Sequence, residues 1–257
     1  MLNRPASSIR LILAVFPVAL ACQAKVESAE AIDWGGISSP IVLKGDAGTA
    51  YRDPAVVHHD GVFHLFCTMV RTEEEGRIYS YTVQSMSGDL VGWSEPRIIT
   101  PRGQHLNYSS PGNVVRFEGE WVLCLQSYPR RDYRRGGAVR WADGTARLFV
   151  MRSRDLVDWG EPELLRVKGA GVAEEDMGRM IDPYLIEDKD EPGKWWCFYK
   201  QNGVSLSWSR DLKNWTYFGH ADSGENVCVL VEGDEYVLFH SPANGIGGKR
   251  SNDLKKW

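Results

Sequence analysis

Carboxylate and hydroxyl side chains recur where four apolar segments of the sequence begin. The four sites are Asp53-Pro54, Ser110-Pro111, Asp182-Pro183 and Glu225-Asn226. Cleavage of the acetal bond between sugars uses such groups: one carboxylate activates water as general base, and a protonated carboxylic acid delivers a proton to the leaving oxygen. A third negative group raises the pKa of the acid. Asp53, Asp182 and Glu225 are therefore candidate catalytic residues, provided that the fold brings them together.

Each of these sites opens a unit that the chain repeats. The unit continues with an apolar run, a Gly-containing turn, a second apolar run and a Ser-x-Asp-Leu-x-x-Trp element, which ends at Trp93, Trp159, Trp215 and Trp257. Self-similarity at about 40 to 65 residues, with several short strands in each unit, is typical of propeller blades. Because the innermost strand of each blade lines the central channel, equivalent sites converge at one mouth.

The residue types at the four sites go beyond what a turn requires. Ser110 fits a plain turn position, but Glu225 does not, because Glu is a poor turn former. The apolar runs are consecutive rather than alternating, as in Phe63 to Phe66, which predicts strands that are buried on both faces.

The Ser-x-Asp-Leu-x-x-Trp elements are interpreted as structural. Asp turns the chain, Leu packs, and Trp wedges between blades. A catalytic role for these aspartates is not favoured, because every unit has one whereas an active site is single. The element is also similar to the Asp-box of sialidases, but a pocket Arg triad and a Tyr nucleophile cannot be placed in this sequence.

Composition narrows the class of partner. The chain has 257 residues and a net charge of −4, which argues against nucleic acid or an anionic membrane as a partner. It contains 10 Trp and 10 Tyr, and flat aromatic faces can stack on sugar rings, although we expect most of these residues in blade cores.

Residues 1–31 are expected to be a signal peptide. Arg4 and Arg10 precede an apolar run, Leu11 to Ala21, that is too short for a membrane span. Small residues follow, with candidate cleavage sites at 19–21 and 29–31. We therefore expect an exported protein, periplasmic or extracellular, with lipidation at Cys22 as a secondary alternative.

Four further cysteines lie within apolar runs of different units: Cys67, Cys124, Cys197 and Cys228. Strands of separate blades rarely bring such positions together, so buried free thiols are expected even in an exported protein. No metal-ligand spacing such as Cys-x-x-Cys occurs, so a zinc site is not indicated.

The order of these motifs resembles the five-bladed propeller glycoside hydrolases, most closely family 43, with family 117 related and family 32 more distant. The motifs that carry the resemblance are Arg52-Asp53-Pro54, Ile181-Asp182-Pro183 and Gly224-Glu225-Asn226. It implies Asp53 as general base, Asp182 as the residue that orients and tunes the acid, and Glu225 as general acid. The family commonly has Glu-Gly-Pro at the third site, and Glu232 and Glu235 are the fallback candidates for the acid.

The resemblance also implies the fold class: an all-β, five-bladed β-propeller formed by residues 32–257, with about four blades present. The fourth unit stops at Trp257, so we expect the chain to be truncated at its C-terminal end. In propellers an N-terminal strand often closes the last blade, and Ile41-Val42-Leu43 is the candidate for that strand.

Five residues near the catalytic candidates are expected to bind substrate: Arg52, His105, Tyr108, Ser110 and His240. Arg52 could instead pair with Asp182 or form an inter-blade salt bridge. His240 could tune the acid or hold a central ion, since the resemblance leaves room for a central Ca²⁺, but it could equally be structural; no other cofactor is indicated. The basic cluster 130–135 is interpreted as a solvated hairpin, with a lip for acidic sugars as the alternative.

The sequence thus predicts an exported, monomeric glycoside hydrolase that acts on oligo- or polysaccharides. By resemblance it would invert the anomeric carbon, with Asp53 as base, Glu225 as acid and Asp182 as modulator. Three alternatives remain: a retaining enzyme of the family 32 type with Asp53 as nucleophile, a non-catalytic carbohydrate-binding propeller, and an interaction scaffold whose carboxylates do not share a cavity. Endo or exo action and the sugar are not determined by the sequence.

Overall fold

The computed structural model describes residues 32–37, 41–104, 106–129 and 144–257. All strands of these described residues belong to the unit Ile32–Trp257. The predicted signal peptide, Cys22, His105 and the basic cluster 130–135 lie outside the described residues. No helix in the part of the chain that the structure describes is long and apolar enough to cross a membrane.

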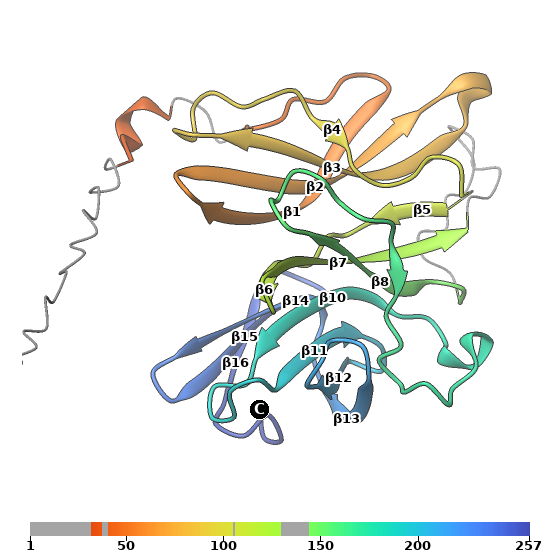
Figure 1. Ribbon diagram of the computed structural model, residues 1–257, viewed down its shortest axis with the longest axis vertical. Coiled ribbons are helices and arrows are strands. Elements are labelled where there is room, and N and C mark those ends of the chain that lie inside the picture. Colours follow the sequence, from red (N-terminus) through yellow and green to blue (C-terminus); the bar gives the residue numbers. More distant parts are fainter. Residues whose placement is uncertain (1–31, 38–40, 105, 130–143) are drawn as a thin grey trace, which may run out of the picture. The chain divides into compact units, whose positions relative to one another are not determined.

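Four antiparallel sheets follow one another along the chain, and each corresponds to one repeat of the sequence (Figure 1). Blade 1 contains β1 (Thr49–His59), β2 (Val62–Thr72), β3 (Ile78–Ser87) and β4 (Arg97–Ile98). Blade 2 contains β5 (Leu106–Ser109), β6 (Val114–Phe117), β7 (Glu120–Pro129), β8 (Arg147–Ser153) and β9 (Glu163–Leu164). Both β5 and β6 pair with β7, so together they form the inner strand of blade 2.

Blade 3 contains β10 (Ile181–Glu187), β11 (Trp195–Lys200), β12 (Val204–Ser209) and β13 (Trp215–Ala221). Blade 4 contains three strands, β14 (Glu225–Glu232), β15 (Glu235–Ser241) and β16 (Gly247–Ser251). The helical segments of the described residues are three short 3₁₀ turns, Trp34–Gly36, Glu74–Gly76 and Glu174–Met177. The predicted all-β propeller is therefore confirmed, with four blades formed by the described residues.

Consecutive blades pack against one another, and each contact involves the inner strand of the following blade (Figure 1). Contacts join β3 to β5, β7 to β10, and β10 to β14. Each interface holds its own apolar core, represented by Phe66 with Leu123, by Cys124 with Leu185, and by Phe198 with Leu238. Neighbouring residues of one strand face opposite blades, because side chains alternate across a sheet. This arrangement explains the consecutive apolar runs, such as the five buried residues from Trp195 to Tyr199 on β11, where Cys197 packs toward blade 2 and Phe198 toward blade 4.

The Ser-x-Asp-Leu-x-x-Trp elements form a tight turn at the end of the third strand of each blade. In blade 2, Asp155 Oδ1 accepts hydrogen bonds from the amides of Val157 and Asp158, each 2.8 Å long. These amide donors, Asp158 first, hold the pKa of Asp155 below its usual value. Leu156 is fully buried, and the Trp159 ring meets Phe66 of blade 1 edge to face at 5.3 Å. The structural interpretation of this element is confirmed, including the Trp that wedges between blades.

Two expectations about the strands and thiols need correction. Ile41-Val42-Leu43 is not a strand of the last blade; Leu43 packs against the blade 1 core around Met69 and Tyr81, while Ile41 is 65% exposed. Cys67, Cys124 and Cys197 are buried free thiols as expected. Cys228 is also free but is exposed, because its side chain lies on the open face of β14.

Candidate active site

An irregularity in strand pairing marks the same position of three inner strands. Pairing is interrupted between Arg52 and Ala55 in β1, between Ile181 and Tyr184 in β10, and between Glu225 and Cys228 in β14. In blade 2 the corresponding interruption separates β5 from β6. A bulge of this kind bends the strand and redirects a side chain out of the regular alternation.

The first residue of each interruption has a left-handed backbone. The φ angles are 55° at Asp53, 45° at Ser110, 52° at Asp182 and 54° at Asn226. Asp and Asn are among the few residues other than Gly that tolerate this conformation, because their short side chains can bond locally. The Asp-Pro and Ser-Pro pairs of the sequence therefore mark the bulges.

The fourth site is shifted by one residue from the sequence-based alignment. Asn226, not Glu225, has the backbone conformation of Asp53 and Asp182. Glu225 instead occupies the last paired position before the bulge, which corresponds to Arg52 in blade 1 and Ile181 in blade 3. The register was missed because Val227 stands where the other three units have Pro.

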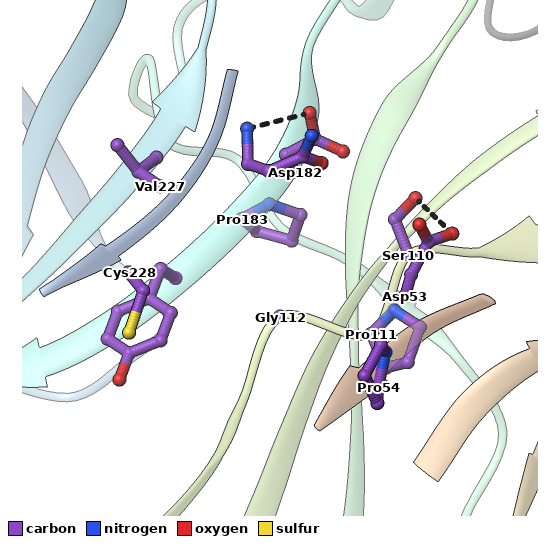
Figure 2. Close-up of a pocket in the computed structure, with 11 residues that line it drawn as sticks. Asp53, Pro54, Ser110, Pro111, Gly112, Asp182, Pro183, Val227 and Cys228 are labelled. Atoms are coloured by element: carbon purple, nitrogen blue, oxygen red, sulfur yellow. Dashed lines mark hydrogen bonds between the residues drawn. The ribbon is translucent and has the colours of Figure 1, made fainter. Parts of the chain in front are cut away.

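One cavity of about 370 Å³ collects these bulges from all four blades (Figure 2). Its lining residues are Asp53, Pro54, Ser110, Pro111, Gly112, Asp182, Pro183, Tyr184, Asn226, Val227 and Cys228. Residues separated by more than 170 positions in sequence thus share one wall, as expected if equivalent sites of the blades converge at one mouth of the channel. Glu225 is not among the lining residues, although its charge acts on Asp182, as described below.

Asp53 is held through one of its two carboxylate oxygens. Oδ2 accepts hydrogen bonds from the hydroxyls of Thr68 at 3.0 Å and Ser110 at 3.2 Å. The same oxygen lies 3.4 Å from Nε of Arg52. Figure 2 shows Ser110 beside Asp53 at the cavity wall.

Asp182 is more buried, with 8% of its surface exposed. Its pKa is raised from 3.8 to about 6: burial is the largest cause, the amide of Asn226 opposes it, and the negative charges of Glu225 and Asp53 add to the rise. That amide donates to Oδ2 of Asp182 at 3.3 Å (Figure 2). Asp182 therefore changes its protonation state in mildly acidic solution, with two other carboxylates close enough to influence it.

The segment that carries Glu225 is fixed from behind by His240. Nδ1 of His240 accepts a hydrogen bond of 2.9 Å from the amide of Gly224, so in the neutral ring Nε2 carries the proton. Gly224 admits no side chain, because a Cβ there would lie 2.0 Å from the carbonyl oxygen of Ser241. Gly247 is needed for a similar reason: a Cβ there would lie 2.5 Å from the His240 ring. His240 does not line the cavity, so its position does not fit the expected role in substrate binding. It contacts the backbone just before Glu225 instead.

The remaining candidates divide between wall and core. Ser110 lines the cavity, and Arg52 pairs with Asp53 rather than with Asp182. Tyr108 is fully buried and packs edge to face on Phe149 at 5.9 Å, while its hydroxyl donates to Gln104. This position in the hydrophobic core does not fit the expected role of Tyr108 in the pocket wall.

Several residues that shape the site carry no sequence signal. Asn113 joins blades 2 and 3, because its side chain donates to the carbonyl of Leu185 at 2.7 Å and accepts from the amide of Leu185 at 2.9 Å. Gly112 lies beside this bridge, where a Cβ would meet the Pro183 carbonyl oxygen at 1.5 Å. Tyr184 and Cys228 form part of the wall. The pKa of Tyr184 is raised, mainly by burial and then by the neighbouring side chain of Cys228. Only Asn113 and Gly112 stand next to a recognisable Ser-Pro motif.

The described residues gather no group of three or more His, Cys, Asp or Glu side chains that could hold a metal ion. They therefore do not provide a charged donor set for the Ca²⁺ that the resemblance allows, and no chemical role is assigned to such an ion.

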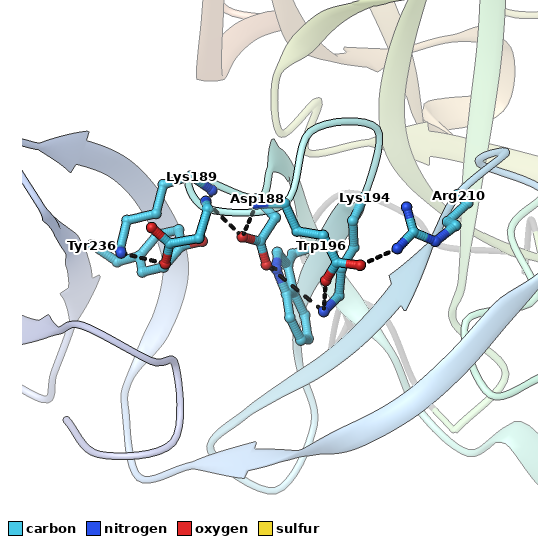
Figure 3. Close-up of polar contacts among 8 residues, drawn as sticks. Asp188, Lys189, Lys194, Trp196, Arg210 and Tyr236 are labelled. Atoms are coloured by element: carbon cyan, nitrogen blue, oxygen red, sulfur yellow. Dashed lines mark hydrogen bonds and ion pairs between the residues drawn. The ribbon is translucent and has the colours of Figure 1, made fainter.

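A second cavity, of about 270 Å³, lies between blades 3 and 4 near the end of β10 that is remote from Asp182. Acidic residues at this cavity hold a loop through the polar contacts that Figure 3 shows. Asp188 accepts from the amides of Asp190 and Glu191 and from Nε1 of Trp196, at 2.9, 3.0 and 2.7 Å. The Tyr236 hydroxyl of blade 4 accepts from the amide of Lys189 at 2.9 Å. This network joins the two blades and is a structural element.

The sequence matches no protein-family model and no curated protein sequence. Solved structures with the same fold include an exo-1,5-α-L-arabinanase from a bovine ruminal metagenomic library, with 17% identity, a TM-score of 0.54, and 82% of this chain and 74% of that chain covered. An exo-β-1,3-galactanase from Clostridium thermocellum has 20% identity and a TM-score of 0.56, and the match covers 82% of this chain and 48% of that one.

A third structure, a glycosyl hydrolase from Bacteroides ovatus, has 15% identity and a TM-score of 0.56, with 81% of this chain and 69% of that chain covered. At these identities the likeness concerns the fold. The chain has the propeller fold of these glycosidases, which agrees with the fold that the sequence motifs imply.

Proposed function

We propose that the protein is a glycoside hydrolase in which Asp53 acts as general base, Glu225 as general acid and Asp182 as the group that tunes the acid. The observation that carries this proposal is the shared cavity, whose wall contains Asp53 from blade 1 and Asp182 from blade 3. The charge of Glu225 from blade 4 reaches the same carboxyl group of Asp182. Three acids from three blades therefore act on one site.

Each acid has one task in the proposed reaction. Asp53 takes a proton from water as the water oxygen bonds to the anomeric carbon. The bond from that carbon to the glycosidic oxygen breaks, and the leaving oxygen takes the proton of Glu225. Asp182, whose carboxyl group feels the charge of Glu225, is the group proposed to tune this proton transfer. The reaction consumes one water and inverts the anomeric carbon.

The substrate class is supported by the fold and by the size of the cavity. The solved neighbours include an arabinanase and a galactanase, both named as exo-acting enzymes. A cavity of about 370 Å³ lies at the small end of the range for ligand pockets. We therefore propose an oligo- or polysaccharide substrate. Export of the protein is also proposed, on the basis of the charged and apolar pattern of residues 1–31.

The test is hydrolysis of a panel of aryl glycosides and plant or algal polysaccharides by the wild-type protein, Asp53→Asn and Asp60→Asn. Asp60 is the control because it lies on the same blade in the β1–β2 turn, with a side chain that is 86% exposed. Loss of the general base is expected to lower kcat by about 10² to 10⁴-fold. Asp60→Asn is expected to keep wild-type activity.

Two results would contradict the proposal. Activity of Asp53→Asn equal to that of Asp60→Asn would remove Asp53 from the mechanism. Sugar binding without any hydrolysis by the wild type would favour a carbohydrate-binding propeller. For an active protein, ¹H NMR of the first-formed anomer decides the stereochemistry: retention would assign Asp53 as a nucleophile instead of a base.

A further inference from the structure

The second strand of each blade carries a polar residue opposite the residue that precedes the bulge. These residues are Thr68, Gln126, Lys200 and Ser241, and they face Arg52, Ser109, Ile181 and Glu225 across the pair. Thr68 and Gln126 are buried within otherwise apolar stretches of β2 and β7. A buried polar group in such a strand needs hydrogen-bond partners, and both residues find theirs in the next blade.

Thr68 and Gln126 both bind the amide of a bulge residue. Thr68 Oγ1 accepts from the amide of Ser110 at 2.7 Å, and Gln126 Oε1 accepts from the amide of Asp182 at 2.9 Å. Bulges leave backbone groups outside the regular ladder. The second strand of one blade therefore completes the bulge of the following blade.

Thr68 differs from Gln126 in its second contact. Its hydroxyl also donates to Asp53 Oδ2 at 3.0 Å, whereas Gln126 donates to the hydroxyl of Ser109 at 3.1 Å. An amide can only donate, so the Ser110 amide occupies a lone pair of Thr68, and the single hydroxyl proton of Thr68 points to Asp53. The direction of this bond is therefore fixed by the backbone of blade 2.

The contacts close a ring around one oxygen of the candidate base. Ser110 donates its own hydroxyl to the same Oδ2 at 3.2 Å, so Ser110 holds Thr68 by its amide and Asp53 by its side chain. Among the described residues, all three close polar contacts of the Asp53 carboxylate are made by Oδ2. The other oxygen, Oδ1, is then the one available to a water molecule in the cavity.

We infer that Thr68 is a positioning residue of the hydrolase: it fixes the rotation of the Asp53 carboxylate through a hydrogen bond whose direction blade 2 imposes. This inference rests on the proposed function. It assigns no contact between Thr68 and substrate, since Thr68 is fully buried and does not line the cavity.

The test compares Thr68→Val, Thr68→Ser and Thr82→Val. Thr82 is the matched control, because it pairs with Thr68 across β2 and β3, is equally buried, and has a hydroxyl without a hydrogen-bond partner in the described structure. Loss of a hydrogen bond to a charged group is expected to lower kcat of Thr68→Val by about tenfold to a hundredfold. KM is expected to change by less than about threefold, because Thr68 does not touch substrate.

The pH profile separates this role from a purely structural one. A hydrogen-bond donor stabilises a carboxylate, so the acid limb of the kcat profile of Thr68→Val is expected to lie at higher pH than that of the wild type. Thr68→Ser keeps the hydroxyl and is expected to restore both kcat and the acid limb. Thr82→Val is expected to match the wild type. If Thr68→Val does not fold, Thr68→Cys serves in its place, because a thiol is a weak donor of similar size.

The failure of this inference can be told apart from the failure of the proposed function. If Asp53→Asn is inactive but Thr68→Val matches Thr82→Val in kcat and acid limb, the positioning role is wrong. If the wild type hydrolyses no substrate, the proposed function fails, and the ¹³Cγ signal of Asp53, assigned with Asp53→Asn, becomes the readout. A titration midpoint that is higher in Thr68→Val than in Thr82→Val supports the positioning role, and equal midpoints overturn it.

Discussion

Asp182 is the residue for which the structure makes the sharpest thermodynamic prediction. Burial, with Glu225 and Asp53 nearby, raises its pKa from 3.8 to about 6 in the folded protein. Below pH 4 both the folded and the unfolded chain bind the proton, so Asp182 does not alter stability. Between these pKa values the unfolded chain ionises while the folded protein keeps the proton. Stability is therefore lost as pH rises through about 6, and the loss is complete above that pH.

The size of the effect follows from the difference between the two pKa values. One pKa unit corresponds to about 1.4 kcal/mol, so ionisation of Asp182 costs about 3 kcal/mol of folding free energy when it is complete, and about 2 kcal/mol of this appears between pH 4 and pH 8. Asp182→Asn removes the titration. It keeps an oxygen that can accept from the amide of Asn226, which Oδ2 of Asp182 does at 3.3 Å. We therefore expect the variant to be more stable than the wild type at pH 8 and similar to it at pH 4.

The assay is urea unfolding of the wild type and Asp182→Asn at several pH values from 4 to 8, with Asp60→Asn as an exposed control. The free energy of unfolding of the wild type is expected to fall relative to Asp182→Asn by about 2 kcal/mol over this range. Curves of wild type and variant that stay parallel from pH 4 to pH 8 would refute the reasoning. Hydrolysis by Asp182→Asn is expected to fall at the same time, because a buried acid that costs stability is retained for its effect on the site.

Two further predictions concern the cavity wall. Gly112→Ala places a Cβ 1.5 Å from the Pro183 carbonyl oxygen, so we expect urea unfolding to show a free energy of unfolding lower by at least about 3 kcal/mol. In the control Gly219→Ala, the new Cβ has nothing within 4 Å, and the free energy of unfolding is expected to change by less than about 1 kcal/mol. Equal effects of the two substitutions would contradict the close approach of blades 2 and 3. Cys228 is exposed at the cavity, whereas burial raises the pKa of Cys67 and of Cys124 to about 12. We therefore expect iodoacetamide to label Cys228 before Cys67 and Cys124, as measured by peptide mass spectrometry. Bound sugar should slow the labelling of Cys228. Faster labelling of Cys67 would show that blade 1 opens more readily than its packing implies.

The propeller could be predicted from the sequence because its signals are local and repeated. Each blade carries its own turn, its own apolar runs and its own Ser-x-Asp-Leu-x-x-Trp element, so one unit supports the interpretation of the next. Asp53, Ser110 and Asp182 were found for the same reason: each precedes a Pro and begins a bulge. Without that Pro, the alignment placed Glu225 at the position that Asn226 occupies.

The parts that could not be predicted depend on contacts between blades. Nothing adjacent in sequence distinguishes Thr68 from Thr82, yet Thr68 binds two residues of the site and Thr82 uses its hydroxyl for no such contact in the described structure. Tyr108 is expected in the pocket wall from its position before the second inner strand. The alternation of β5 turns its ring toward Phe149 instead. A side chain's face depends on strand register, which the sequence fixes only weakly over four residues.

The strained backbone at the bulges has an explanation only if the direction of the side chains matters. Non-Gly residues with positive φ cost about 1 kcal/mol or more each. At Asp60 and Glu118 the strain makes a tight hairpin, because the chain reverses there. At Asp53, Asp182 and Asn226 the strand continues in the same direction afterwards, so the strain does not serve a reversal. What the bulge changes is where the side chain and the amide point: two carboxylates into one cavity, and the amide of Asn226 onto Asp182. A propeller that served only as a scaffold would gain stability from regular strand pairing at these positions. The free-energy cost of the strained bulges therefore links the fold to the proposed chemistry.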